Sequence, residues 1–173
     1  MKRFFTGLTL ILIVVAFFAC SEDNSLEKLR ENELAKLDLF IKEHYPDSVA
    51  KPSGLFYIEN IEGAGDSLIR FADRVQIFYA TWTIDSVLVD ESEGYTIGHR
   101  FEPLELVVGA SSVIKGLEEA VTYMREGGKA NLVLPSEVAY GQNGKGSIPG
   151  FTTLLMEIEV HKVYPFIKPT EEE

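Results

Sequence analysis

The stretch VIKGLEEAVTYMREGG (residues 113–128), followed by NLVLPSEVAYG (131–141) and SIPGFTTLL (147–155), decides the fold. Its first part carries apolar residues at steps of three and four, as on one face of a helix: Ile114, Leu117, Val121 and Met124. The glycine pair 127–128 predicts the end of that helix. A buried strand and a turn-rich segment follow, with apolar and aromatic groups at their ends. Together these elements can enclose a pocket that excludes water and contains no ionisable nucleophile.

Five segments around this helix have the length and the residue types of β-strands. They are Leu55–Glu59, Arg74–Thr83, Leu104–Val108, Ala130–Leu134 and Leu154–Val163. In the last segment, apolar and polar residues alternate, which is typical of a half-buried antiparallel strand. The expected fold class is α+β, with a five-stranded antiparallel sheet and one short helix.

A second helix is predicted nearer the N-terminus, over Leu26–Tyr45. Ser25 can cap its start and Pro46 ends it. Its apolar residues recur near helical spacing: Leu26, Leu29, Leu37, Phe40 and Ile41. We interpret it as a packing or spacer helix. A dimerisation helix is the alternative, but the apolar stripe has no sustained heptad.

The first twenty residues have the pattern of an export signal. Lys2 and Arg3 precede a nearly continuous apolar run over 4–18, which is shorter than the ~20 apolar residues of a membrane span. Cys20 directly follows Ala19, as in a bacterial lipoprotein signal, where the cysteine is acylated. An ordinary signal peptide or an uncleaved anchor is the alternative. We therefore expect a protein of the bacterial cell envelope, lipid-anchored to a membrane and facing the periplasm or the cell surface.

Charge and residue types exclude several classes of function. Without residues 1–19, which contain two cations and no acids, the net charge of −11 becomes −13, and such a protein repels nucleic acid. Cys20 is the only cysteine, and the three histidines are far apart in the sequence: His44, His99 and His161. The glycine-rich segment 141–147 lacks the spacing of a phosphate-binding loop and is interpreted as a turn. Neither a metal nor a cofactor is expected.

Several sequence fragments occur in a specific order over about a hundred residues. They are PSGL (52–55), VQIFY (75–79), VIKGLEEA (113–120), Met124 with Gly127, Pro135, AYG (139–141), Ile148-Pro149 and Leu154. Residues 52–164 thus resemble an FKBP-type peptidyl-prolyl cis–trans isomerase domain. The resemblance implies a half-barrel, in which the antiparallel sheet curls round the short helix with a pocket between them. The other parts are then a lipoprotein signal peptide (1–19), a tether with the N-terminal amphipathic helix (20–51), and a charged tail (165–173).

The resemblance also implies the reaction, which is rotation about the peptide bond before proline in polypeptide substrates. Ile114 would offer its backbone N–H to a substrate carbonyl, and Tyr140 its hydroxyl. Tyr79 and Asp90 would lie at the pocket wall, with the Asp90 carboxylate orienting or polarising the amide. The residues that would line the substrate pocket are Val89, Leu104, Val113, Leu117, Ile148 and Met156.

The pocket departs from the family in one respect. Where the family usually has aromatic residues, this chain has aliphatic ones: Val89, Leu104, Leu117 and Met156. Each missing aromatic contact with a proline ring costs ~0.5–1.5 kcal/mol of binding. We therefore expect weak isomerase activity and poor affinity for the family's macrolide inhibitors. The alternatives are a non-catalytic FKBP-like peptide-binding or chaperone module on a membrane lipoprotein, and a purely structural envelope lipoprotein.

Overall fold

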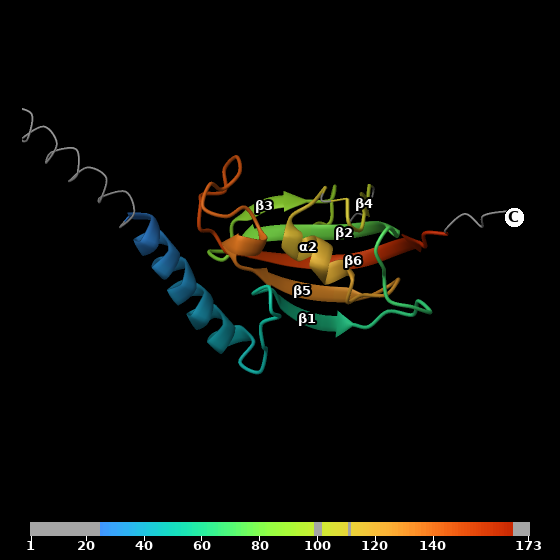
Figure 1. Cartoon of the computed structure of the whole chain (residues 1–173), viewed down its shortest axis with the longest axis horizontal. Helices are drawn as coiled ribbons and strands as arrows, with labels where there is room; N and C mark the ends of the chain where they lie inside the picture. Colours follow the sequence, from blue (N-terminus) through green and yellow to red (C-terminus); the bar gives the residue numbers. More distant parts are fainter. Residues whose placement is uncertain (1–24, 99–101, 111, 168–173) are drawn as a thin grey trace, which may run out of the picture.

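The computed structural model describes residues 25–98, 102–110 and 112–167, which form a curved sheet with helices on both sides (Figure 1). The expected signal peptide 1–19, Cys20, His99 and most of the expected charged tail lie outside the described residues. In the described part, no helix combines the length and the apolar composition that a bilayer crossing needs.

Six strands make one antiparallel sheet in this part of the chain. They are β1 (Phe56–Ile61), β2 (Arg74–Thr83), β3 (Leu88–Glu91), β4 (Leu104–Val107), β5 (Lys129–Leu134) and β6 (Leu154–Tyr164). Their order is β1-β5-β6-β2-β3, and β4 also pairs with β2. The predicted α+β class with an antiparallel sheet is confirmed, and all five predicted strands are present. β3 is an additional strand, which the sequence pattern does not predict because its four residues are too few to show alternation.

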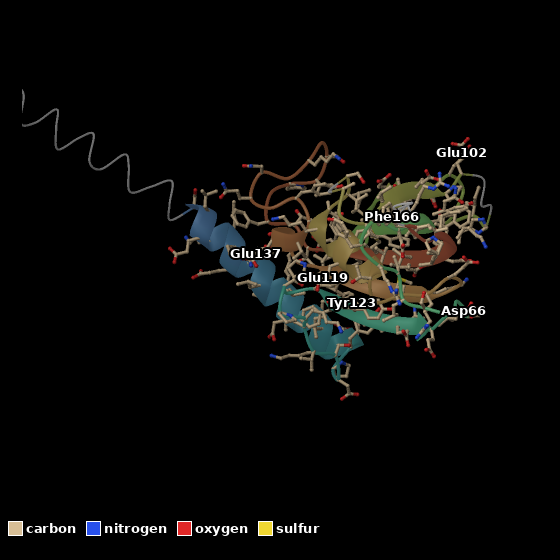
Figure 2. All side chains as sticks on the ribbon, turned by 45° about the vertical axis from the view of Figure 1, so that its right-hand side comes forward. Asp66, Glu102, Glu119, Tyr123, Glu137 and Phe166 are labelled. Atoms are coloured by element: carbon tan, nitrogen blue, oxygen red, sulfur yellow. The ribbon has the colours of Figure 1, made fainter. Side chains whose placement is uncertain are left out.

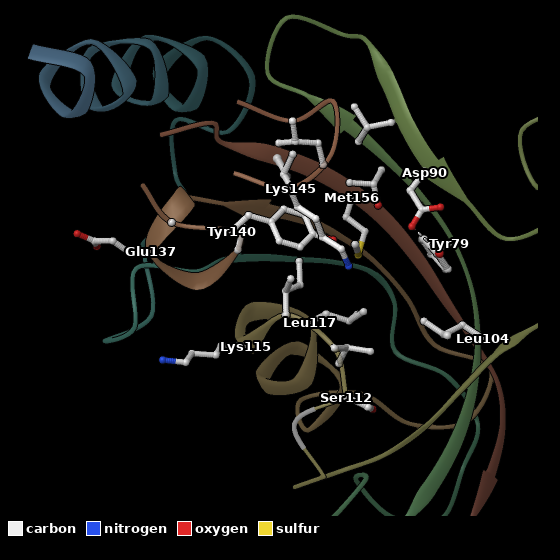
Figure 3. A pocket seen from close by; sticks show the side chains of 18 residues that line it. Tyr79, Asp90, Leu104, Ser112, Lys115, Leu117, Glu137, Tyr140, Lys145 and Met156 are labelled. Carbon is white, nitrogen blue, oxygen red and sulfur yellow. Dashed lines mark hydrogen bonds between the residues drawn. The ribbon is translucent and has the colours of Figure 1, made fainter. Parts of the chain in front are cut away.

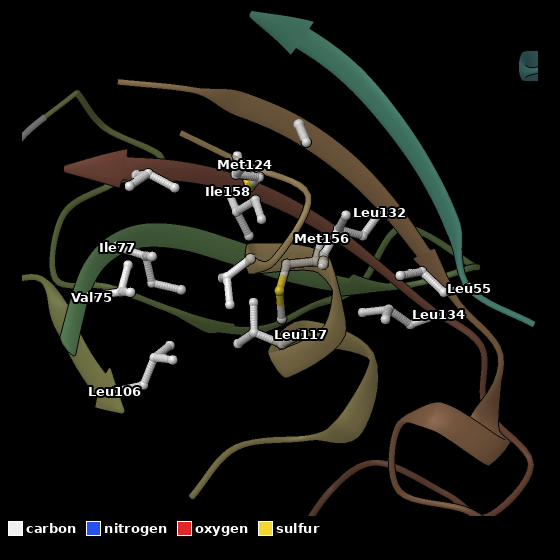
Figure 4. Close-up of a cluster of buried hydrophobic side chains, with 14 of the residues drawn as sticks. Leu55, Val75, Ile77, Leu106, Leu117, Met124, Leu132, Leu134, Met156 and Ile158 are labelled. Carbon is white, nitrogen blue, oxygen red and sulfur yellow. The ribbon is translucent and has the colours of Figure 1, made fainter. Parts of the chain in front are cut away.

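Helix α2 (Lys115–Val121) lies across the inner face of the sheet and closes the main core (Figure 4). Leu117 and Val121 are buried there against side chains of β2, β5 and β6, among them Ile77, Leu132 and Ile158. Burying one such side chain contributes roughly 1.5–3 kcal/mol.

The predicted end of this helix at the glycine pair is wrong. The helix stops at Val121, and Met124 is buried in the segment that follows the helix. Gly127 instead lies just before β5, where its φ is +79° and its N–H donates to the Val160 carbonyl at 2.9 Å.

The N-terminal helix, residues 25–44, packs on the outer face of the same sheet. Leu37 and Ile41 are buried against Val133, whose neighbours along β5 face the inner core. A packing role for this helix is therefore visible in the structure. The predicted stripe does not extend along the whole helix, because Leu26 and Leu29 are 41% and 50% exposed.

Candidate active site

A cavity of about 700 Å³ lies between the inner face of the sheet and the start of α2 (Figure 3). Strands β2, β3, β4 and β6 contribute to its wall, together with the segment 135–153, which we call the cavity loop. The structure brings together all the residues that the sequence singled out for the site: Tyr79, Val89, Asp90, Leu104, Val113, Ile114, Leu117, Tyr140, Ile148 and Met156. Their chemical roles remain predictions.

Tyr79 and Asp90 form a hydrogen-bonded pair on one wall of the cavity. The Tyr79 hydroxyl donates to the Asp90 carboxylate at 2.9 Å. Ser92 fixes the backbone beneath, because its Oγ accepts the Tyr79 N–H at 3.0 Å and donates to the Tyr79 carbonyl at 3.2 Å. Burial first, and then the hydrogen bond to Asp90, raise the pKa of Tyr79 well above its usual range. The phenol is therefore a neutral donor at neutral pH, and it holds the exposed carboxylate at the rim.

Two donors border the cavity without a hydrogen-bond acceptor among the described residues. Ile114 is the N-cap of α2, with φ −63° and ψ 145°, and its carbonyl accepts the N–H groups of Leu117 and Glu118. Its own N–H has no such partner, as expected at the start of a helix. The Tyr140 hydroxyl is also unpaired in the described part of the chain, and the Lys145 ammonium lies 5.3 Å from the centre of its ring.

The floor between these donors is aliphatic. Leu117 and Met156 are only 3% and 5% exposed, and Leu117 faces the Tyr140 ring across the cavity (Figure 3). Trp82 does not replace a missing aromatic residue, because it lines a separate small cavity on the outer face of the sheet. The one polar exception on the floor is Thr81, whose buried hydroxyl has no hydrogen-bond partner in the described part of the chain.

The glycine-rich segment is a turn, as expected, and it shapes the cavity loop. Gly144 has a φ of +66°, and a Cβ there would lie 2.1 Å from the Ile148 carbonyl oxygen, so only glycine fits. The loop holds Tyr140 on one side of this turn and Ile148 on the other.

Several further residues line the cavity that the sequence pattern does not indicate. They are Thr81, Ser112, Lys115, Glu137, Ala139, Gly141, Lys145 and Leu154. Lys145 and Glu137 stand in the same turn-rich segment as Tyr140, and that proximity was the signal available for them. The buried Thr81 had its own signal, since it is two residues after Tyr79 on a strand and so faces the same side.

The remaining candidate groups are not gathered into a second site. In the ranges 25–98, 102–110 and 112–167, no three His, Cys, Asp or Glu side chains are placed to hold a metal ion. His44 stacks on Phe40 with ring centres 4.3 Å apart, and His161 packs beside Phe78.

The family of the chain follows from a match of residues 65–161 to the model of the FKBP-type peptidyl-prolyl cis-trans isomerases. The chain belongs to this family. The FK506-binding protein of Neisseria meningitidis serogroup B is 36% identical over 112 residues, which cover 64% of this chain and 97% of that protein. The FKBP-type isomerase fold thus accounts for the cavity, and the reaction class is peptidyl-prolyl cis–trans isomerisation.

Solved structures of this FKBP-type fold agree with the assignment. FkpA from Escherichia coli matches with a TM-score of 0.68 at 27% identity, covering 92% of this chain and 72% of that one. A peptidyl-prolyl cis-trans isomerase from Pseudomonas syringae matches with a TM-score of 0.66 at 28% identity, covering 80% of this chain and 96% of the other. Both matches extend beyond the 65–161 range, so they include residues outside the family domain.

Proposed function

We propose that this FKBP-type isomerase is a weak catalyst that assists the folding of extracytoplasmic proteins, while acyl chains on Cys20 hold it to a membrane of the bacterial cell envelope. The observation that carries the catalytic part is the cavity with an aliphatic floor, bordered by two donors that have no acceptor among the described residues, the Ile114 N–H and the Tyr140 hydroxyl. Proline-containing polypeptides are the substrates.

The cavity acts on the barrier to rotation about the bond before proline, which is ~18–20 kcal/mol without a catalyst. As the amide twists, its nitrogen loses conjugation and the charge separation decreases. An aliphatic wall of Leu117 and Met156 favours that less polar state over the planar amide. The Ile114 N–H and the Tyr140 hydroxyl then hold the neighbouring carbonyl in place. Each tenfold gain in rate requires about 1.4 kcal/mol, so these two contributions suffice for modest catalysis.

The same aliphatic wall is the reason why we propose weak catalysis. A proline ring that contacts Leu104, Leu117 or Met156 gains burial but no stacking on an aromatic face. Losing one such contact weakens transition-state binding by ~0.5–1.5 kcal/mol. We therefore expect a measurable kcat/KM that is lower than that of a relative with an aromatic pocket, and poor binding of macrolide inhibitors.

The catalytic proposal is tested with the full mature chain and a Xaa-Pro peptide in a protease-coupled assay or by NMR exchange. The expected result is acceleration above the uncatalysed rate. Tyr140→Phe should lower it by removing the hydroxyl, and Ile114→Gly should lower it by loosening the backbone that orients the retained N–H. If the chain suppresses aggregation of an unfolded protein but accelerates no peptide, the non-catalytic chaperone alternative replaces the proposal.

The anchoring part is supported by the basic, apolar and cysteine-ended pattern of residues 1–20. We expect the chain expressed in a bacterium to incorporate labelled palmitate and to sediment with membranes. The Cys20→Ser variant should lose the label and become soluble after export. If the Cys20→Ser variant keeps the label, lipid attachment at this cysteine is refuted.

A further inference from the structure

The N-terminal helix places a buried carboxylate against both ends of the cavity loop. Glu33 is 4% exposed, although the same helix packs on the sheet mainly through the apolar residues Leu37, Phe40 and Ile41. Its partners on the domain are Ser136, in the single-turn helix η1 (Ser136–Val138), and Thr153, immediately before β6. These partners are 103 and 120 residues from Glu33 in the sequence.

Described residues donate four hydrogen bonds to the Glu33 carboxylate, with donor–acceptor distances from 2.6 to 3.0 Å. Oε1 accepts the Ser136 N–H at 2.6 Å and the Thr153 hydroxyl at 3.0 Å. Oε2 accepts the Ser136 hydroxyl and an Arg30 guanidinium N–H, both at 2.7 Å. One carboxylate therefore joins the beginning of the cavity loop to its end. Because charge-assisted hydrogen bonds are stronger than neutral ones, this buried link holds the helix firmly to the domain.

A second contact reinforces the first. The Arg30 guanidinium also pairs with Glu137, which lines the cavity and lies beside the N-terminal helix in Figure 2. Burial raises the pKa of Glu33, but the hydrogen bonds from Ser136, Arg30 and Thr153 outweigh it, so the pKa lies below its ordinary value. The carboxylate is consequently charged at neutral pH.

The cavity loop is folded tightly on itself, so its position depends on where its ends are held. The Gly141 N–H donates to the Ser136 carbonyl at 2.7 Å, and the Phe151 N–H donates to the Gly141 carbonyl at 3.0 Å. A Cβ at Gly150 would lie 1.9 Å from the Gln142 carbonyl oxygen, which shows how closely the two sides approach. A shift at Ser136 is therefore passed to the next residues of the loop, including Tyr140.

We propose that Glu33 is a positioning residue of the isomerase: by holding both ends of the cavity loop, it sets the place of the Tyr140 hydroxyl over the cavity. The N-terminal helix is then part of the scaffold of the active site and not only a spacer. An apolar residue at position 33 would extend the packed stripe of Leu37 and Ile41 without the cost of burying a charge. The carboxylate is instead satisfied by groups of the cavity loop and by the arginine that also reaches that loop.

The inference is tested with Glu33→Ala, Glu33→Gln and a matched control, Asp73→Ala. Asp73 is also a buried carboxylate, 6% exposed, and it accepts the N–H groups of Arg70 and Phe166, both at 2.8 Å, outside the cavity loop. Each variant is made in the full mature chain and assayed at a temperature where circular dichroism shows it fully folded. This control separates the general loss of a buried carboxylate from the loss of loop placement.

We expect Glu33→Ala to lower kcat/KM by about tenfold to a hundredfold, since displacing a reacting geometry by about 1 Å can have this effect. Asp73→Ala should lower stability and leave kcat/KM within about twofold. Glu33→Gln should recover most of the activity, because its amide oxygen can still accept from Ser136 and Thr153. Glu33→Ala with unchanged kcat/KM, or Asp73→Ala with an equal loss, would overturn the proposal.

Because the kinetic test rests on the proposed function, amide hydrogen exchange provides a readout that does not need turnover. The Glu33→Ala substitution should speed exchange at Gly141 and Phe151 more than at Val160, which lies in the central strand. If the chain shows this selective exchange but no isomerase activity, the proposed function is refuted and the role of Glu33 in holding the cavity loop is kept. If exchange speeds up equally in the loop and the sheet, the role of Glu33 in holding the loop is refuted.

Discussion

Replacing Tyr140 by phenylalanine removes one hydroxyl from the cavity and leaves the aromatic ring in place. Since that hydroxyl has no hydrogen-bond partner among the described residues, its loss should not change the free energy of unfolding. If the hydroxyl binds a substrate carbonyl as the amide twists, its loss removes a hydrogen bond worth about 0.5–1.5 kcal/mol net. That range corresponds to a fall in kcat/KM of about twofold to thirteenfold.

The assay is protease-coupled isomerisation of a Xaa-Pro peptide, with urea unfolding measured on the same preparations. Tyr123→Phe is the matched control, because its hydroxyl donates to Glu119 at 2.8 Å and lies outside the cavity lining. It should leave kcat/KM unchanged. The reasoning is refuted if Tyr140→Phe keeps the full rate, or if its rate falls only in proportion to a loss of stability.

Three more predictions concern the cavity floor, the cavity loop and the Glu33 carboxylate. Thr81→Val should raise the free energy of unfolding by about 1 kcal/mol in urea titrations, because it replaces by a methyl group a buried hydroxyl that has no partner among the described residues; a loss of stability would show that the hydroxyl has a partner. Gly144→Ala should lower kcat/KM by about tenfold or more, because the new Cβ displaces the Ile148 carbonyl and with it the loop; an unchanged rate would contradict this. Unfolding free energy should fall as the pH drops below 4.5, because unfolded Glu33 takes up a proton before folded Glu33 does; Glu33→Gln should flatten this fall, and identical profiles would count against the lowered pKa.

Much of the fold could be predicted because the longest strands carry clear alternation. β2 has the predicted bounds, and β6 differs from its prediction by one residue at its end. The end of α2 could not be read in the same way. Met124 continues the apolar spacing after the backbone has left the helix, so periodicity reports burial and not hydrogen bonding. The prediction for the N-terminal stripe was wrong in part because periodicity does not show how far the helix runs along the sheet. The first turns of this helix project away from the sheet (Figure 1), and Leu26 and Leu29 are exposed.

The site residues could be predicted where the order and spacing of sequence fragments identify them. A contact between residues that are far apart in the sequence could not be predicted in this way. The family resemblance predicted that the site residues from Tyr79 to Met156 line one cavity, and in the structure they do. Nothing in the sequence distinguishes Glu33 from the acidic residues around it on the helix. Its burial depends on Ser136 and Thr153, which meet only after β5 and β6 have paired.

The position of β6 has a consequence for how the protein is made. Of the six described strands, β6 is the last to be synthesised, and it lies inside the sheet, hydrogen-bonded to β2 along one edge and to β5 along the other. Until Leu154–Tyr164 has been synthesised, both neighbours expose unpaired backbone edges that favour self-association. A product stalled or cleaved before residue 154 therefore lacks the centre of the sheet. Such a fragment should form inclusion bodies rather than a smaller folded domain.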